Sequence, residues 1–156
     1  MPCRRSGSRH TPLVLWYSSV VLLVGLVSAL AAADFPLQFT DDLGRHITLT
    51  ARPQRIVSLA PSNTERLFAL GAGRAVVGVT TVDTYPPEVL AVAKVGGFVP
   101  KSISIETIVS LKPDLVLAAG ELQRAAIEAL ERVGLTVVAL EDPDTFEAVY
   151  AGMRLI

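Results

Sequence analysis

The five residues from Leu115 to Ala119 read LVLAA and are followed by Gly120. Three more short apolar runs occupy residues 56–59, 75–79 and 136–140, and each leads into a loop of small or polar residues. A strand that is apolar at nearly every position, and not only at every second one, is buried on both faces. Such strands, separated by helical stretches, predict an α/β fold in which helices flank a parallel sheet.

The stretches between these runs carry helix signals. Ser62 and Glu65 have the spacing of a capping box and predict a helix over 64–70. Ser104 is the predicted cap of a helix over 105–111, and a shorter helix is expected over 88–91. The predicted buried residues of the 105–111 helix are Ile105, Ile108 and Val109. Over 122–133 the expected apolar stripe is Leu122, Ala126, Leu130 and Val133, with Glu128 and Arg132 paired outside it and Gly134 ending the helix.

Residues 35–40 and 46–50 alternate apolar and polar side chains on either side of a turn that contains Gly44. This pattern predicts a β-hairpin at the periphery of the sheet.

The amino-terminal residues have the features of an export signal. Three arginines and no acidic residue precede the apolar stretch 13–27, and small residues alternate up to Ala33. We therefore expect residues 1–33 to be a signal peptide that is cut after Ala33, or alternatively after Ala31, and the protein to be periplasmic. The other interpretation is an uncleaved membrane anchor.

The last residues are apolar and helical in character. Asp144 and Glu147 predict the start of a helix at Thr145, and no stop signal precedes Ile156. The expected organisation is a lobe over 34–144 and a truncated helix over 145–156.

The charge balance and the residue inventory exclude several functions. Residues 34–156 hold 11 basic and 15 acidic residues, a net charge of −4, without a basic cluster, which argues against nucleic acid as a partner. The single cysteine, Cys3, lies within the predicted signal, and His46 is the one histidine after it. No phosphate-binding loop, nucleophile motif or set of metal ligands is present, so we expect neither an enzyme nor a resident cofactor or metal.

Ligands of open parallel sheets bind beyond the carboxyl ends of the strands. Here that edge collects the loops 60–63, 80–85, 120–121 and 141–144. The candidate ligand-binding residues are Pro61, Ser62, Asn63, Tyr85 and Phe98. For the first three the alternative is turn and cap chemistry alone, and for the two aromatic residues it is packing against a local core. Tyr85 also offers a phenolate oxygen for ferric iron.

Glu106 occupies the first turn of a predicted helix. Its position is explained either by a favourable interaction with the helix dipole or by docking on an arginine of a partner.

Taken in order, several segments resemble the amino-terminal lobe of the periplasmic binding proteins of cobalamin and iron-complex ABC importers. They are RIVSLAPSNTE (55–65), LGAG (70–73), VGVT (77–80), YPPE (85–88), VGG (95–97), IE (105–106) and LKPDLVL (111–117). The segment TDDLGR (40–45) is similar too. The resemblance covers nearly all of the chain after residue 33.

The resemblance implies two α/β lobes that are joined by a long helix and hold a cobalamin- or iron-chelate-type ligand between them. It implies that this chain holds the first lobe and that Glu106 docks on the membrane permease. We also expect the chain to act as a monomer. Val82 stands where cobalamin-binding relatives tend to have an aromatic residue, and Tyr85 matches the tyrosine that some haem-binding relatives use as an iron ligand. A haem-binding importer component, an enzyme on a similar lobe and a non-functional remnant are the alternatives.

Overall fold

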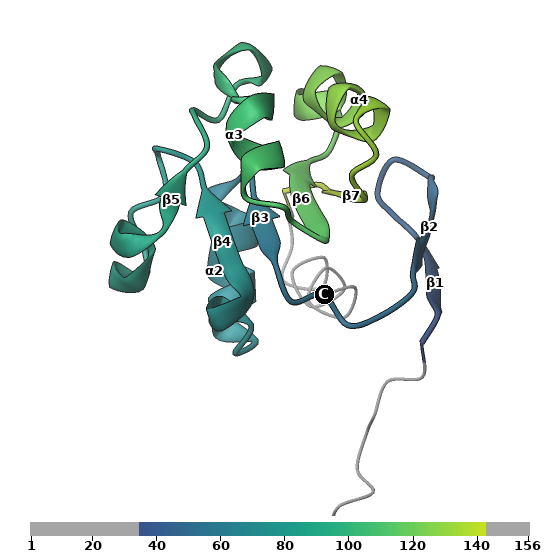
Figure 1. Ribbon diagram of the computed structural model, residues 1–156, viewed down its shortest axis with the longest axis horizontal. Helices are drawn as coiled ribbons and strands as arrows, with labels where there is room; N and C mark the ends of the chain where they lie inside the picture. Colours follow the sequence, from purple (N-terminus) through teal and green to yellow (C-terminus); the bar gives the residue numbers. More distant parts are fainter. Residues whose placement is uncertain (1–34, 143–156) are drawn as a thin grey trace, which may run out of the picture. The chain divides into compact units, whose positions relative to one another are not determined.

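A computed structural model of the protein describes residues 35–142, which form an α/β unit (Figure 1). The predicted signal peptide at 1–33 and the predicted helix at 145–156 lie outside the described residues. Within the described part, none of the helices has the length and apolar character needed to cross a membrane.

A five-stranded sheet with the order β5-β4-β3-β6-β7 forms the centre of the unit, and all of its strands are parallel. The strands are β3 (Ile56–Ser58), β4 (Val76–Val79), β5 (Ala93–Lys94), β6 (Leu115–Ala119) and β7 (Val137–Leu140). This confirms the predicted fold class and all four predicted strands. The two-residue edge strand β5 was not predicted, because it is too short to show a periodic pattern.

Alternate residues of the strands enter two separate apolar clusters. On β6, Val116 and Ala118 belong to one cluster, while Leu115 and Leu117 belong to the other. On β7, Val137 and Ala139 face the first cluster, and Val138 and Leu140 the second. Both faces of the sheet are therefore covered, which is why these strands are apolar at every position.

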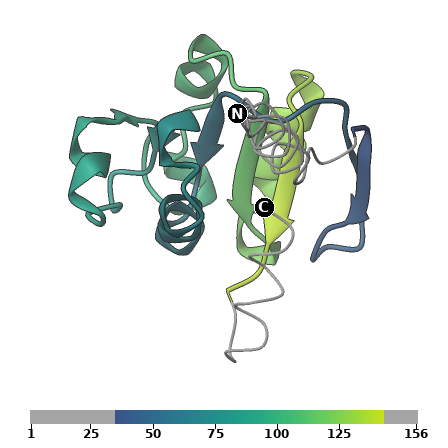
Figure 2. The ribbon, with the colours of Figure 1, turned by 90° about the horizontal axis from the view of Figure 1, so that it is seen from below.

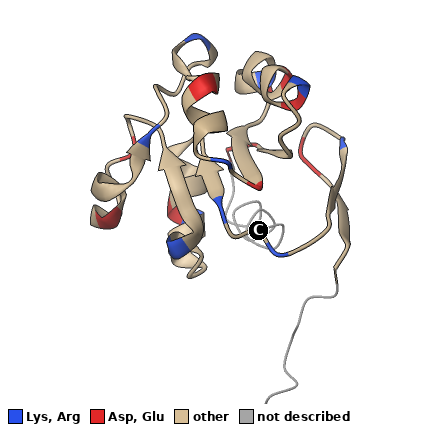
Figure 3. Cartoon of the chain, in the orientation of Figure 1, with Lys and Arg blue, Asp and Glu red and all other residues tan. Residues whose placement is uncertain are grey.

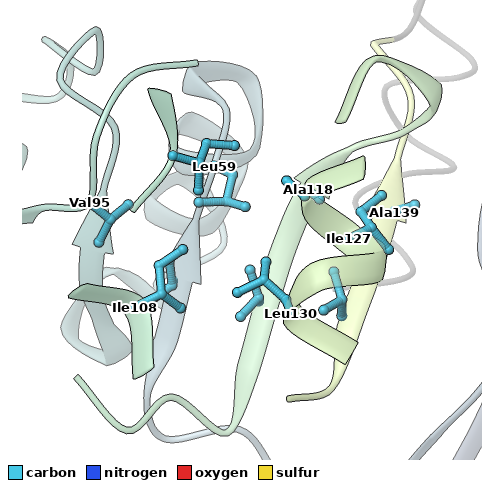
Figure 4. Close-up of a cluster of buried hydrophobic side chains, with 12 residues drawn as sticks. Leu59, Val95, Ile108, Ala118, Ile127, Leu130 and Ala139 are labelled. Atoms are coloured by element: carbon cyan, nitrogen blue, oxygen red, sulfur yellow. The ribbon is translucent and has the colours of Figure 1, made fainter. Parts of the chain in front are cut away.

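The first cluster lies beneath helices α3 (Ile105–Ser110) and α4 (Arg124–Arg132). Figure 4 shows Ile127 and Leu130 of α4 beside Ala118 and Ala139 of the strands. Ser104 caps α3 as predicted, because its Oγ accepts a hydrogen bond from the Thr107 amide at 3.2 Å.

The predicted apolar faces of these two helices were only partly right. Ile108, Ala126 and Leu130 are buried, but Val109, Leu122 and Val133 are exposed. The 122–133 segment begins as a 3₁₀ turn, η4 (Glu121–Gln123), so its first residues do not follow the α-helical period. The predicted Glu128–Arg132 pair is also not among the ion pairs of the described residues.

Helix α2 (Pro61–Ala69) packs on the second cluster through Leu67 and Phe68. It starts three residues earlier than predicted, and its cap residue is Ala60, which has no side-chain acceptor. The predicted capping box at Ser62 and Glu65 is therefore wrong. Pro61 explains the difference, because its fixed φ favours the first position of a helix.

The hairpin of β1 (Leu37–Thr40) and β2 (His46–Leu49) is confirmed and is antiparallel. Figures 1 and 2 both place it beside β7, at the opposite end of the sheet from β5. It is less peripheral than predicted, because Phe39, Ile47 and Leu49 join the second cluster. Short 3₁₀ turns complete the unit: η1 (Gly73–Ala75), η2 (Pro87–Ala91) and η3 (Pro100–Ser102).

Candidate functional site

A hollow of about 510 Å³ lies at the carboxyl ends of the parallel strands. The residues that line it are Pro61, Ser62, Glu65, Val82, Phe98 and Asp142. They come from four loops or helix starts that follow β3, β4, β5 and β7. The edge of the sheet predicted from the strand pattern is thus hollowed in the structure, as expected for an open parallel sheet.

Helix α2 forms one wall. Glu65 lies four positions after Pro61 and three after Ser62, so its side chain neighbours both on the helix surface. The amino end of the helix opens on this wall without a side-chain cap. Glu65 was not predicted as a site residue, although its spacing from Pro61 and Ser62 was a usable signal.

Val82 is brought to the hollow by a tight loop after β4. Asp83 is buried, and its Oδ2 accepts hydrogen bonds from the backbone amide of Thr80, at 2.9 Å, and from the hydroxyl of the same residue. The Asp83 amide bonds back to the Thr80 carbonyl at 3.3 Å. This closed loop leaves Val82 half exposed, at 51%.

Phe98 lies in the loop that follows β5. An antiparallel bridge between Gly96 and Ile103 closes this loop, together with a 2.9 Å hydrogen bond from the Gly97 amide to the Ser102 carbonyl. Gly96 has φ +107°, and a Cβ there would lie 2.1 Å from the Ser102 carbonyl oxygen, so only glycine suits the closure.

Asn63 does not line the hollow. Its side chain is completely buried, with Nδ2 donating to the Ala118 carbonyl at 3.3 Å and Oδ1 accepting from Arg66 at 3.1 Å. The Asn63 side chain joins α2 to the end of β6 and is buried away from the hollow, an arrangement that does not support its predicted contact with a ligand. The burial of Asn63 could not be predicted from its place after a strand, because it depends on where α2 begins.

Tyr85 and Glu106 are exposed and lie outside the set that lines the hollow. Tyr85 is 64% exposed on the connection between β4 and β5. Glu106 is in the first turn of α3, 3.4 Å from the Ser104 hydroxyl that donates to its carboxylate. Their predicted roles, ligand contact and permease docking, remain predictions.

The charged groups of the hollow have one sign. Glu65 and Asp142 contribute carboxylates, and the six lining residues include no lysine or arginine. Elsewhere acidic and basic residues are interspersed along the helices and loops (Figure 3). Among residues 35–142 no cluster of three or more His, Cys, Asp or Glu side chains could hold a metal ion. The hollow therefore combines two carboxylates, which accept hydrogen bonds, with the uncapped amino end of α2, whose backbone N–H groups donate them.

Comparison with known proteins decides the family. The model of the family described as "Periplasmic binding protein" matches residues 56–156. The chain belongs to the periplasmic binding protein family. This confirms the resemblance found in the sequence.

Individual relatives agree with this membership. An uncharacterized ABC transporter substrate-binding lipoprotein, YvrC of Bacillus subtilis, is 43% identical over 125 residues, which cover 78% of this chain and 39% of that protein. A cobalamin-binding protein of Halobacterium salinarum is 34% identical over 118 residues, 76% of this chain and 32% of that one. The crystal structure of a possible iron-binding periplasmic protein of Staphylococcus epidermidis superposes with a TM-score of 0.58 at 35% identity, covering 65% of this chain and 40% of that one. The chain thus spans about two fifths or less of the length of these proteins.

Proposed function

We propose that this chain is the first lobe of the substrate-binding component of an ABC importer, and that the hollow at the carboxyl edge of the sheet is its half of the ligand cleft. The observation that carries the proposal is the convergence of Pro61, Ser62 and Phe98, all predicted from the sequence as ligand contacts, on one hollow. In this proposal residues 1–33 direct export to the periplasm, residues 34–144 are the lobe and residues 145–156 begin the helix to a second lobe.

The ligand class follows from the lining. Phe98, Val82 and Pro61 offer apolar surface to a large ring or chelate, while Glu65 and Asp142 accept hydrogen bonds. Corrinoids carry amide groups that donate such bonds, and the cobalamin-binding relative supports this class. Neutral or cationic iron chelates fit the same description, whereas ligands rich in carboxylates would be repelled by the two acids.

Titration followed by NMR tests this assignment on the 156-residue chain, because it detects weak binding to half of a cleft. We expect cyanocobalamin or cationic ferrioxamine B to shift the backbone amide signals of the lining residues. Phe98→Ala should weaken that response about tenfold, the equivalent of ~1.4 kcal/mol. Absence of shifts at the lining residues with both probes, at millimolar concentration, would refute the proposed ligand site.

The haem alternative rests on Tyr85, whose phenol is exposed. If haemin binds with a change in its visible absorption that Tyr85→Phe abolishes, Tyr85 is an iron ligand and haem replaces the corrinoid in this proposal. Comparing the single variants Tyr85→Ala and Phe98→Ala separates the two aromatic contacts, because Phe98 lines the hollow and Tyr85 does not.

Docking on the permease is proposed to use Glu106, with this chain acting as a monomer. Glu106→Lys should weaken binding to the permease reconstituted in lipid nanodiscs. Glu128→Lys, a charge reversal at an exposed position of α4, is the matched control and should bind like the native chain. Equal binding by both variants would contradict the assignment of Glu106.

The mass of the protein in the cell envelope tests the two-lobed organisation. A species roughly twice as heavy as residues 34–156 is expected for two lobes. A species of about 13 kDa, scaled from the 16.6 kDa chain, would show that a single lobe is the native product.

A further inference from the structure

Gln123 is a fully buried amide beneath the candidate site. Its Oε1 accepts a hydrogen bond from the Ala119 amide at 2.8 Å. Its Nε2 donates to the carbonyls of Leu59, at 2.8 Å, and Phe98, at 2.7 Å. Both N–H groups of the side chain are thereby used, which is the condition under which a buried amide is tolerated.

The three partners of Gln123 belong to different parts of the sheet edge. Ala119 ends β6, Leu59 directly follows β3, and Phe98 lies in the loop after β5. Gln123 itself precedes α4, at the end of η4. One side chain therefore connects two central strands to a loop from the far edge of the sheet.

Of these partners, Phe98 is the one that lines the hollow. The bridge between Gly96 and Ile103 holds the base of its loop, and the Gln123 amide holds the carbonyl of Phe98 itself. Fixing the backbone at Phe98 to the interior limits the directions that its ring can take.

We propose that Gln123 is a positioning residue for ligand binding: it fixes the backbone at Phe98 and thereby the direction of the Phe98 ring at the wall of the hollow. The inference deepens the proposed function and rests on it. Gln123 does not touch the ligand, because it is buried and is not a lining residue.

Replacing Gln123 also removes buried hydrogen bonds, so a loss of stability alone would not distinguish positioning from support of the fold. Thr64→Val is a suitable control. Thr64 is equally buried, donates to the Ser58 hydroxyl at 2.8 Å on the same edge of the sheet, and has no hydrogen bond to the Phe98 loop.

A fluorescence reporter makes the test independent of any ligand. Trp16 is the one tryptophan of the chain, so Trp16→Phe combined with Phe98→Trp leaves a single tryptophan at the wall of the hollow. In this background Gln123→Met should shift the tryptophan emission to longer wavelength and increase its quenching by acrylamide, while Thr64→Val should change neither. Equal emission and quenching in the two variants would overturn the proposal.

The second readout is affinity. Gln123→Met with Phe98 intact should weaken the cyanocobalamin response about tenfold, as expected when one positioning hydrogen bond is lost. If the methionine variant does not fold, Gln123→Asn takes its place with the same expected outcomes. Asparagine carries the same carboxamide on a side chain that is shorter by one methylene. An unresponsive reporter refutes the role of Gln123, whereas a responsive reporter in a chain that binds neither cyanocobalamin nor ferrioxamine B refutes the proposed ligand site.

Discussion

The Asp41 carboxylate accepts a 3.0 Å hydrogen bond from the backbone amide of Ala139, although 98 residues separate the two in the sequence. Arg45 completes the contact, with Nε donating to Asp41 at 2.9 Å and Nη2 donating to the Val137 carbonyl at 3.0 Å. The turn of the hairpin thus occupies hydrogen-bonding groups of β7, the edge strand of the sheet. An edge strand covered in this way is protected from pairing with other chains.

This contact makes stability dependent on pH. Burial by itself would raise the pKa of Asp41, but hydrogen bonds from the Arg45 side chain and backbone and from the Ala139 amide hold the pKa below its ordinary value. The contribution of the pair is therefore fully present above the unfolded pKa of ~3.9 and is lost as the pH falls through the lower folded value.

Asp41→Asn should lower the free energy of unfolding at pH 7 by about 3 kcal/mol, because Arg45 loses a buried anionic partner. It should also flatten the decline in stability toward acid. Urea unfolding between neutral and acidic pH measures both effects, and Glu128→Gln on the exposed face of α4 is the control. A variant as stable as the control would contradict the contact.

The two serines predicted as helix caps should differ. Ser104→Ala removes the acceptor of the Thr107 amide and should cost about 1 kcal/mol of stability. Ser62→Ala should have nearly no effect, because Ser62 lies inside α2 and Ala60 is the cap residue. Thermal unfolding of the two variants measures the difference, and equal losses would argue against the observed start of α2.

Substitutions at core and surface positions of the α4 region should differ in how much stability they cost. Leu130 is completely buried, so Leu130→Ala should cost about 2–5 kcal/mol, with part of the loss arising from the cavity left behind. Val133 is 53% exposed, and Val133→Ala should stay within about 0.5 kcal/mol. Denaturant midpoints measure both losses of stability. A large loss for Val133→Ala would support the buried apolar stripe that the sequence predicted.

Gly78 has no room for a side chain. A Cβ there would meet Leu111 Cδ1 at 2.8 Å and Val95 Cγ1 at 2.9 Å, so Gly78→Ala should cost about 1–3 kcal/mol through overpacking. The same change should cost less in a Leu111→Ala background, because the nearest clashing atom is removed. A double-mutant cycle measures this coupling, and purely additive effects would show that the clash is not the cause.

An aromatic residue at Val82 should strengthen binding of a planar ligand. Val82 lines the hollow and is half exposed, so Val82→Trp adds aromatic surface without disturbing a core. We expect cyanocobalamin to bind about tenfold more tightly by NMR titration. Leu90→Trp, at a 68% exposed position outside the hollow, is the control and should leave the affinity unchanged.

Position along the chain is enough to predict some of the residues that line the hollow, whereas packing decides the others. Pro61, Ser62 and Phe98 follow strand ends and do line the hollow, while Asn63 is one residue further and faces the interior. Asp142 was missed, because an acidic side chain beside a strand end gives no signal until the loops are brought together, and Glu65 was missed although its helical spacing from Pro61 and Ser62 was a usable signal.

The sequence by itself determined the layers of this protein, because apolar residues at every strand position require a sheet covered on both faces. It also determined local signals such as the Ser104 cap, whose donor is three residues away. Only the tertiary structure decided which polar side chains are buried. Gln123 meets Leu59 and Phe98, and Asp41 meets Ala139, across 25 to 98 residues of sequence. A buried polar group is stable only where its partners are in place, and those partners are brought to it by the packing of the whole sheet.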